Sequence, residues 1–270
     1  MKTPITYYGG KQSMLKYILP IIPTHNLYCE PFFGGGAVFF AKEPSKVEVI
    51  NDLNAEVVNF YRMLKTNFVE LQLLVSGTMY SRHEHVKAKV IYDHPYLFDE
   101  VRRAWAFWVL TNTGFAGQIS DSWGYSVQKS ACSLKLYNKK ENFQTAFAQR
   151  LNLVQVECDD AIKVIKRFDR KDTFHYVDPP YFNSNLGHYG GYTAYHFEEL
   201  LKTLGDVEGK FLMSSYDSDL LQKYIKKNKW HSYKIVMNLS AAKEKKGAKK
   251  VEVLTANFPI KEVLDSIVKK

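Results

Sequence analysis

The feature that most constrains this chain is a short, mainly apolar run that ends in an acid and two prolines. Residues Thr173–Val177 form the run, and Asp178–Tyr181, with the sequence DPPY, follow it directly. The run reads as a buried strand, and the tetrad stands where that strand would open at its carboxyl end. Ligands of open α/β sheets bind at the carboxyl ends of strands, so the tetrad is predicted to lie at a binding site.

The four residues of the tetrad can together hold an exocyclic amino group and the flat base that carries it. An ionised Asp178 is purely a hydrogen-bond acceptor. The carbonyl groups of Pro179 and Pro180 are held rigidly because proline fixes φ, and Tyr181 offers a ring for stacking. The alternative is an Asp-Pro turn that only closes a strand, since both residue types are common in turns.

A second pattern, strand then glycine turn then helix, lies near the amino terminus. Residues 28–33 lead into Gly34–Gly36, and an apolar segment, residues 37–42, follows. Glycines let the backbone approach a ligand closely, and the start of a helix suits an anion such as a carboxylate. The dinucleotide fingerprint G-x-G-x-x-G fails because Phe39 stands at its third glycine, which counts against a nicotinamide cofactor.

Two further short patterns are compatible with the same kind of site. Val47–Ile50 reads as a strand, and Asp52 follows it at the distance from the glycines at which an acid accepts hydrogen bonds from ribose hydroxyls. The alternative is that Asp52 caps the next helix. Tyr7–Lys11 combines two tyrosines, two glycines and a lysine, and could contact an anion or form a plain turn.

In this order, the patterns resemble the adenine-N6 DNA methyltransferases of the Dam type, the D12 class. The resemblance covers about residues 1–60 and 150–260, and its specific parts are DPPY at 178–181 and PFFGGG at 31–36. It implies an α/β fold, a doubly wound Rossmann-like methyltransferase core built from residues 1–55 and 155–270. Residues 56–154 would then be a mainly helical target-recognition insert.

The resemblance also implies the chemistry: transfer of a methyl group from S-adenosylmethionine to adenine N6 in duplex DNA, with no metal. The tetrad Asp178, Pro179, Pro180 and Tyr181 would hold the target adenine. Asp160 would meet the adenine amino group of the cofactor, with Asp159 as an adjacent rival. The residues assigned to the cofactor are Tyr7, Lys11, Glu30, Gly34, Gly35, Gly36, Asp52, Asp160 and Asp178.

Rival activities stay open at this point. They are cytosine-N4 methylation, whose enzymes usually have serine in the first tetrad position, RNA adenine methylation, and a non-catalytic nucleic-acid-binding relative. Expected partners are duplex DNA and, as an open alternative, a cognate restriction endonuclease. We expect no membrane partner, a monomer or weak dimer, and a location in the cytoplasm of a bacterial or phage-infected cell.

Residues 112–133 are rich in Gly, Ser, Asn and Gln, and this segment is longer than a loop that only connects two elements usually is, so a functional loop is predicted. Its opening, Asn112–Phe115, is similar to the Dam recognition loop, whereas the remainder differs, so no recognition sequence follows. We expect this loop to read bases in the major groove, where base pairs are distinguishable. The residues predicted to contact DNA there are Ser120, Ser122, Trp123 and Tyr125.

The net charge of +9 is confined to one region. Between Lys223 and Lys250 stand ten lysines and one acid, Glu244, which together account for the whole net charge. Such a local excess suggests a polyanion, and lysine suits phosphates better than bases. A solvated surface segment is the alternative. The predicted phosphate contacts are Lys243, Lys245, Lys246, Lys249 and Lys250.

The bulk composition is compatible with this reading. A chain of 270 residues with 46% hydrophobic residues can bury a large core. Its three cysteines show no zinc spacing and indicate a reducing compartment. The eight histidines are scattered, and His83 and His85 are predicted to lie at the surface. Helices are predicted at 12–22, 37–43, 55–74, 97–111, 134–151, 197–204 and 218–228, and strands at 173–177, 210–215, 230–237 and 251–256.

Overall fold

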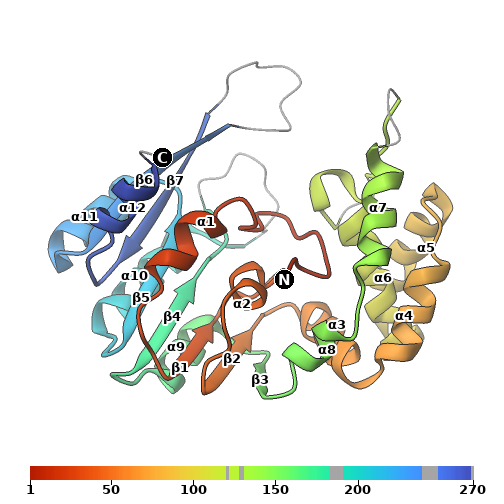
Figure 1. Ribbon diagram of the computed structural model, residues 1–270, viewed down its shortest axis with the longest axis horizontal. Coiled ribbons are helices and arrows are strands. Elements are labelled where there is room, and N and C mark those ends of the chain that lie inside the picture. Colours follow the sequence, from red (N-terminus) through yellow and green to blue (C-terminus); the bar gives the residue numbers. More distant parts are fainter. Residues whose placement is uncertain (120–121, 128–130, 183–190, 239–248, 269–270) are drawn as a thin grey trace. The chain divides into compact units, whose positions relative to one another are not determined.

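The computed structural model describes residues 1–119, 122–127, 131–182, 191–238 and 249–268 (Figure 1). The chain divides into two compact units, which we call the helical unit and the sheet unit. The helical unit comprises Met1–Gln12, Gly34–Ala41 and Asn54–Cys158, and the sheet unit comprises Ser13–Phe33, Lys42–Leu53 and Asp159–Lys270. The assignment of residues 56–154 to target recognition stays a prediction.

The sheet has seven strands in the order β3-β2-β1-β4-β5-β7-β6. Strand β1 pairs in parallel with β2 and β4, β4 pairs in parallel with β5, and β7 pairs antiparallel with β5 and β6. The strands are β1 (Leu27–Glu30), β2 (Val47–Asn51), β3 (Val154–Glu157), β4 (Thr173–Val177), β5 (Lys210–Ser215), β6 (His231–Asn238) and β7 (Lys249–Ala256). The predicted α/β, Rossmann-like class is confirmed.

This strand order has a switch point between β1 and β4. From β1 the chain proceeds outward through β2 to β3, and from β4 it proceeds in the other direction to β5. At such a point the connections leave on opposite faces, and the carboxyl ends of the two strands border a crevice in which ligands bind. The last residue of β1 is Glu30, and the first residue after β4 is Asp178.

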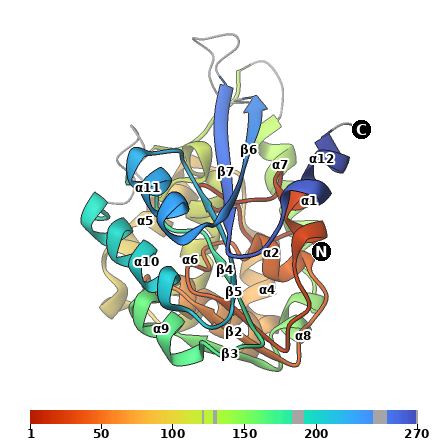
Figure 2. The same cartoon turned by 90° about the vertical axis from the view of Figure 1, so that its left-hand side faces the viewer.

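Helices cover both faces of the sheet within the sheet unit. Figure 2 shows α9 (Ala161–Phe168), α10 (Ala194–Asp206) and α11 (Asp219–Asn228) on one face, with α1 (Leu15–Ile18) and α12 (Lys261–Val268) on the other. Strand β4 is buried along its whole length, as expected of a parallel strand covered on both sides. The helix α10 buries Phe197, Leu200, Leu201 and Leu204, an i, i+3, i+4, i+7 stripe.

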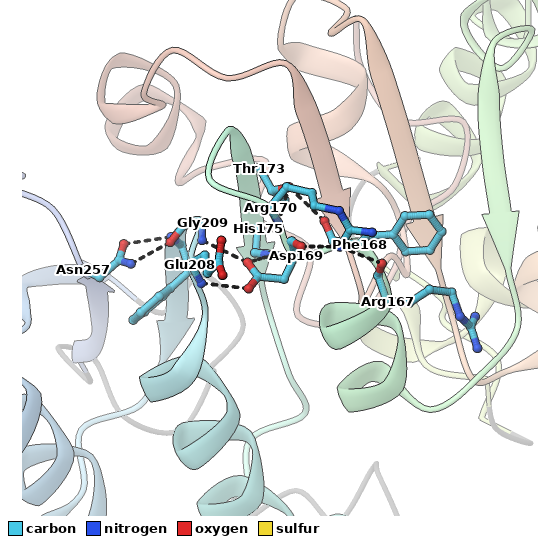
Figure 3. A network of polar contacts seen from close by, with 10 residues as sticks. Arg167, Phe168, Asp169, Arg170, Thr173, His175, Glu208, Gly209 and Asn257 are labelled. Atoms are coloured by element: carbon cyan, nitrogen blue, oxygen red, sulfur yellow. Dashed lines mark hydrogen bonds and ion pairs between the residues drawn. The ribbon is translucent and has the colours of Figure 1, made fainter.

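A polar network lies at the amino-terminal end of β4, the end away from the tetrad (Figure 3). Asp169 accepts hydrogen bonds from the backbone N–H groups of Glu208 (2.8 Å) and Gly209 (3.0 Å). Asn257 donates to the carbonyl of Gly209 (2.9 Å) and accepts from the N–H of Phe211 (3.0 Å). The loops before β4 and β5 and the residue after β7 are therefore tied together.

The helical unit is organised around α6 (Glu100–Thr113), which is buried from Ala104 to Thr113 and packs against α3, α4, α5 and α7. Asp99 caps its first turn by accepting from the N–H of Arg102. The other helices of this unit are α2 (Ala37–Ala41), α3 (Ala55–Thr66), α4 (Phe68–Gly77), α5 (Arg82–Asp93), α7 (Ala131–Glu141) and α8 (Ala146–Arg150). Two short 3₁₀ turns, η2 (Pro95–Leu97) and η3 (Phe115–Gly117), also lie in it, whereas the turn η1 (Leu19–Ile21) lies in the sheet unit.

The first residues of the chain are fastened to this helical unit. Trp108 donates its indole N–H to the carbonyl of Pro4 (3.2 Å). The side-chain oxygen of Asn112 accepts from both the backbone N–H (3.1 Å) and the hydroxyl (3.0 Å) of Thr6. Lys139 donates to the carbonyl of Thr3 (2.7 Å). These bonds fix the backbone on which Tyr7 is carried.

Some predicted elements differ in the structure. The predicted helix 55–74 is two helices separated at Asn67, whose ψ of 36° breaks the helical hydrogen bonding. The predicted helix 134–151 is likewise two, α7 and α8. His85, predicted at the surface, is only 1% exposed and lies on the inner face of α5, with Nδ1 2.8 Å from the hydroxyl of Thr113. Within the described ranges, the helices are all too short or too polar to cross a membrane.

Candidate active site

Acidic side chains mark the carboxyl ends of three adjacent strands of the sheet unit. Glu30 ends β1, Asp52 follows the last residue of β2, and Asp178 follows the last residue of β4. Because β1 pairs with both β2 and β4 in parallel, these ends meet at one edge of the sheet. The sheet edge therefore presents carboxylates at the topological switch point, where open α/β sheets bind ligands.

Glu30 is a buried member of this set. It is 2% exposed and accepts a hydrogen bond of 2.6 Å from the hydroxyl of Tyr28. Burial raises the pKa of Tyr28 well above its ordinary value, and the negative charge of Glu30 raises it further. Tyr28 is therefore a neutral donor, and it helps to fix the Glu30 carboxylate at the end of the strand.

Asn51, the last residue of β2, ties three loops together and was not among the predicted site residues. Its amide donates to the carbonyls of Pro31 (2.9 Å) and Asp159 (3.0 Å), and its side-chain oxygen accepts from the N–H of Asp159 (2.9 Å). Its own carbonyl accepts from the N–H of Phe33 (2.8 Å). Asn51 is 1% exposed, so it acts as a buried joint between the loops after β1, β2 and β3.

The adjacent acids Asp159 and Asp160 have different partners. Asp159 accepts from the N–H of Asp160 (2.8 Å) and pairs with Arg167 (3.0 Å) and Lys163 (3.5 Å). The bond from Asp160 and then the pair with Arg167 lower the pKa of Asp159. Asp160 caps α9 through one oxygen, which accepts from the N–H groups of Ile162 and Lys163. The choice between the two acids stays a prediction.

The tetrad after β4 is held by residues that lie far away in the sequence. The hydroxyl of Tyr181 lies 3.4 Å from Oδ1 of Asp178 and donates to Oε1 of Glu252 on β7. Ser214 on β5 donates to the same Glu252 oxygen (2.9 Å). The ring of Tyr216 packs against that of Tyr181, with centroids 4.3 Å apart and planes inclined by 57°.

The electrostatics of this cluster keep Tyr181 protonated. Burial raises the pKa of Tyr181 well above its ordinary value, and the charges of Asp178 and Glu252 raise it further. Glu252 is 1% exposed, and it stands where the apolar strand pattern would place a core residue. The sequence signal that could have identified Glu252 is an acid within the apolar strand run Val-Glu-Val-Leu. The sequence alone does not indicate that Tyr181 and Ser214 are its partners.

The predicted glycine turn and Tyr7 meet within the helical unit. Gly34 and Gly36 have φ of 47° and 62°, a region that favours glycine. A Cβ at Gly34 would lie 2.8 Å from the ring of Tyr7, and one at Gly35 would lie 3.0 Å from Cβ of Tyr7. The close approach that these glycines allow is thus an approach to Tyr7. Lys11 is 4% exposed and donates to the carbonyl of Gly9 (2.8 Å).

The described part of the predicted recognition loop is folded back on the helical unit. The N–H of Phe115 donates to the backbone carbonyl of Ser122 (2.9 Å). The ring of Trp123 stacks on Tyr125 with centroids 6.1 Å apart, and the guanidinium of Arg82 lies 4.8 Å from the Trp123 centroid. Trp123 therefore packs against side chains of the helical unit, whereas Tyr125 is 65% exposed.

Several predicted contacts fall outside what the structure describes. Ser120 in the loop and Lys243, Lys245 and Lys246 lie outside the described residues. Lys249 and Lys250 begin β7, and their side chains are also outside the description. Among the residues that are described, no group of three or more His, Cys, Asp or Glu side chains could hold a metal ion.

Comparison with known proteins shows relatives across most of the chain. A type II methyltransferase of Lactococcus lactis subsp. cremoris, M1.LlaDCHI, is 28% identical, with 93% of both chains covered. The DNA adenine methylase of Escherichia coli strain K12 is 25% identical over 86% of this chain and 87% of its own. The DNA N-6-adenine-methyltransferase of Escherichia phage P1 is 28% identical over 69% of this chain and 24% of its own.

The family model of the D12 class N6 adenine-specific DNA methyltransferases matches residues 7–239. This range holds the glycine turn, Glu30 at the end of β1, Asp52 after β2, Asn51, and the complete DPPY tetrad. It leaves out only the first six residues and the end of the chain, including β7 with Glu252. Because the match spans most of the 270 residues, the chain belongs to the D12 class of N6 adenine-specific DNA methyltransferases.

Proposed function

We propose that this protein transfers the methyl group of S-adenosylmethionine to N6 of an adenine flipped out of duplex DNA, with the tetrad Asp178–Tyr181 holding that adenine. The observation that carries the proposal is the position of the tetrad. It follows β4 directly, at the switch point beside Glu30 of β1, where a ligand of an open α/β sheet binds. Membership of the D12 family supports the reaction and the substrate class.

The chemistry of the sheet edge fits S-adenosylmethionine. This molecule supplies a methyl group bonded to a positively charged sulfur, and it also carries ribose hydroxyls and an adenine amino group. Carboxylates of Glu30, Asp52 and Asp160 suit a cation and these hydrogen-bond donors. A dinucleotide would bring its negatively charged pyrophosphate to the same acidic edge, which like-charge repulsion disfavours.

The individual cofactor roles that we propose follow the family motifs, and these positions are compatible with them. Asp52 accepts from the ribose and Asp160 accepts from the adenine amino group of the cofactor. Asp160 is preferred to Asp159 because both oxygens of Asp159 already have partners, whereas the capping bonds of Asp160 use one oxygen. In the helical unit, Tyr7, Lys11 and Gly34–Gly36 are assigned to the cofactor because they match the family motifs.

The tetrad acts on the target base. Adenine N6 is a weak nucleophile because its lone pair is delocalised into the ring, and in duplex DNA it is reached only after base flipping. Asp178 and the carbonyl of Pro179 accept the two amino hydrogens, so the nitrogen can become pyramidal and direct its lone pair at the methyl group. The new C–N bond forms as the methyl–sulfur bond breaks, which leaves neutral S-adenosylhomocysteine. The positive charge that develops on N6 is stabilised by acceptors already in place, and N6 then loses one of its hydrogens as a proton to solvent. Tyr181 stacks on the base, a contact worth about 1–3 kcal/mol.

Duplex DNA is contacted outside the tetrad by the recognition loop and the lysine-rich segment. Tyr125 is exposed and suited to a base contact, whereas the roles of Ser120, Ser122 and the lysines rest on the sequence. One relative is named a type II methyltransferase, which supports a restriction endonuclease as a cognate partner. A monomer or weak dimer in the cytoplasm remains our expectation.

Product analysis tests the proposal. The purified protein is incubated with S-adenosylmethionine labelled in the methyl group and with duplex DNA, single-stranded DNA or RNA, and the digested nucleosides are separated by mass spectrometry. We expect labelled N6-methyladenine from duplex DNA. Label found only as methylcytosine, or only in RNA, would overturn the proposal.

A further inference from the structure

The residue that calls for explanation is Glu252. It is a carboxylate 1% exposed in the sheet unit, and it accepts from two hydroxyls, those of Ser214 and Tyr181. Burying a carboxylate is costly unless hydrogen bonds compensate for lost hydration. The mechanism above assigns no task to Glu252, although one of its partners belongs to the catalytic tetrad.

The hydroxyl of Tyr181 has two carboxylates within reach and only one proton to donate. Oxygen–oxygen hydrogen bonds normally span about 2.5–3.0 Å. The separation from Oδ1 of Asp178 is 3.4 Å, which is longer than this range, whereas the contact with Oε1 of Glu252 is much closer. The geometry therefore directs the proton of Tyr181 to Glu252.

The direction of this bond matters for Asp178. A carboxylate that already accepts from a tyrosine is a weaker acceptor for a further donor, and the oxygen involved is partly occupied. If Glu252 could not accept, the carboxylate left within reach of the hydroxyl of Tyr181, among the residues that the structure describes, would be Asp178. The tyrosine would then compete with the amino group of the target adenine for the same carboxylate.

We propose that Glu252 is a positioning residue for methyl transfer, which draws the hydroxyl of Tyr181 away from Asp178 so that Asp178 accepts from the target adenine. This inference rests on the proposed function of the tetrad. Glu252 touches neither reactant in this role, and it acts through Tyr181. Ser214 orients the shared oxygen of Glu252 by donating to it from β5.

A suppression experiment tests this role. Glu252→Leu removes the acceptor, so the hydroxyl of Tyr181 should donate to Asp178 instead. We expect the single-turnover methylation rate to fall about tenfold. Tyr181→Phe removes the hydroxyl that competes but keeps the stacking ring. The double variant should therefore methylate about fivefold faster than Glu252→Leu alone. An acid with a merely structural role would give a double variant no faster than the single one.

The carboxamide variant tests the same point with less disturbance. Glu252→Gln keeps an acceptor of nearly the same shape, but a neutral acceptor is weaker than a carboxylate. We expect a rate about threefold below the original protein, relieved by Tyr181→Phe. If Glu252→Leu does not fold, Glu252→Gln with and without Tyr181→Phe tests the role of Glu252 in its place. A Glu252→Gln protein with the full rate, or one that Tyr181→Phe does not relieve, would overturn the inference.

A matched control is available in the same unit. Tyr224 on α11 donates to Glu198 on α10 (3.1 Å), a second tyrosine–glutamate pair with no part in the site. Glu198→Leu, with and without Tyr224→Phe, should leave the methylation rate unchanged. Affinity for S-adenosylmethionine, measured by titration, should be the same in all Glu252 variants, because the effect lies on the target base.

The failure of the inference and the failure of the proposed function are distinguishable. The unmodified protein is assayed first, and absence of N6-methyladenine from duplex DNA would refute the function itself. If the unmodified protein makes N6-methyladenine but Tyr181→Phe does not relieve the Glu252 variants, only the role of Glu252 is refuted.

Discussion

At the scale of single residues, Asp178 is the side chain on which methyl transfer should depend most. In the proposed mechanism its carboxylate accepts from the target amine, so we expect its effect to fall on the transition state more than on binding of the cofactor. Asp178→Ala should lower the single-turnover rate by at least about a hundredfold with only a modest loss of affinity for S-adenosylmethionine. A rate within about tenfold of the original protein would contradict the assigned role.

Asp172 provides the control for this substitution. It lies at the other end of β4, it is exposed, and its side chain accepts from Asn26 (2.8 Å). Asp172→Ala removes the same carboxylate from the same strand region without touching the tetrad. The control should methylate DNA at the original rate, so that a loss in Asp178→Ala reflects the position of the acid and not the loss of charge.

Asn51 should matter in the opposite way, for the cofactor more than for the chemical step. Asn51→Ala leaves the carbonyls of Pro31 and Asp159 without their donor. Each unsatisfied buried group costs about 1–3 kcal/mol, so the free energy of unfolding should fall. The loops after β1 and β3 would also lose their alignment, and KM for S-adenosylmethionine should rise more than kcat falls.

Thermal unfolding and steady-state kinetics check this expectation together. The idea would fail if Asn51→Ala unfolded at the original temperature and bound S-adenosylmethionine with the original affinity. A loss of stability without any change in KM would restrict Asn51 to a purely structural role. Asn257→Ala offers a comparison, because Asn257 makes similar side-chain to backbone bonds at the other end of the sheet.

The sequence could indicate some of these residues and not others, for a physical reason. Asp178 stands immediately after a mainly apolar run, and Asp52 stands two residues after Ile50, so the local pattern marks the end of a strand. Asn51 bonds to Asp159, 108 residues away, and Glu252 bonds to Tyr181, 71 residues away. Such partners become visible only when the sheet has formed, because no local pattern encodes them.

At the scale of elements, long-range hydrogen bonds also connect the loops at the other end of the sheet, before β4 and β5. Burial alone would raise the pKa of Asp169, but bonds from His175 and from the N–H groups of Glu208 and Gly209 outweigh burial and lower it. Because the folded-state pKa lies below the unfolded value, the stabilisation is present above about pH 4. It is lost as the pH falls through the folded-state pKa.

Asp169→Asn should therefore destabilise the protein in a pH-dependent way. Near neutral pH the free energy of unfolding should fall by about 1–3 kcal/mol, since a charge-assisted acceptor is lost. The gap between variant and original protein should narrow below about pH 4. Denaturant unfolding from neutral pH to below about pH 4 measures this difference in the free energy of unfolding, with Asp172→Asn as the exposed control. A gap that stayed constant with pH would mean that ionisation of Asp169 is not involved.

The predicted elements show the same division between local and distant causes. Strands β4 and β5 begin and end at the predicted residues because their apolar runs are bounded by polar or proline residues. The break at Asn67 was not predicted, since apolar spacing continues from α3 into α4. Helices α5 and α9 were also not predicted. In α5 the buried face includes His85, which apolar periodicity does not register.

At the scale of the whole molecule, the charge distribution predicts how DNA binding responds to salt. The whole net charge of +9 lies between Lys223 and Lys250, and Lys245, Lys246 and Lys249 are part of its densest cluster. Ammonium groups are point charges without the paired geometry that reads base edges. We expect these three lysines to bind phosphates, which positions DNA without selecting its sequence. Each lost contact should reduce the slope of log affinity against log salt concentration by about 0.9.

The triple substitution of Lys245, Lys246 and Lys249 by alanine tests this expectation. Affinity should fall about equally for DNA that contains the sequence methylated by the protein and for unrelated DNA, because the lost phosphate contacts do not depend on the bases. Lys223, Lys226 and Lys227 on α11 provide a matched triple substitution, with the same change of charge at another place in the basic region. If DNA affinity measured across a salt series kept its original slope in the first variant, these lysines would serve only to solvate a surface segment. An equal fall in slope in both variants would instead show that the net charge acts as a whole.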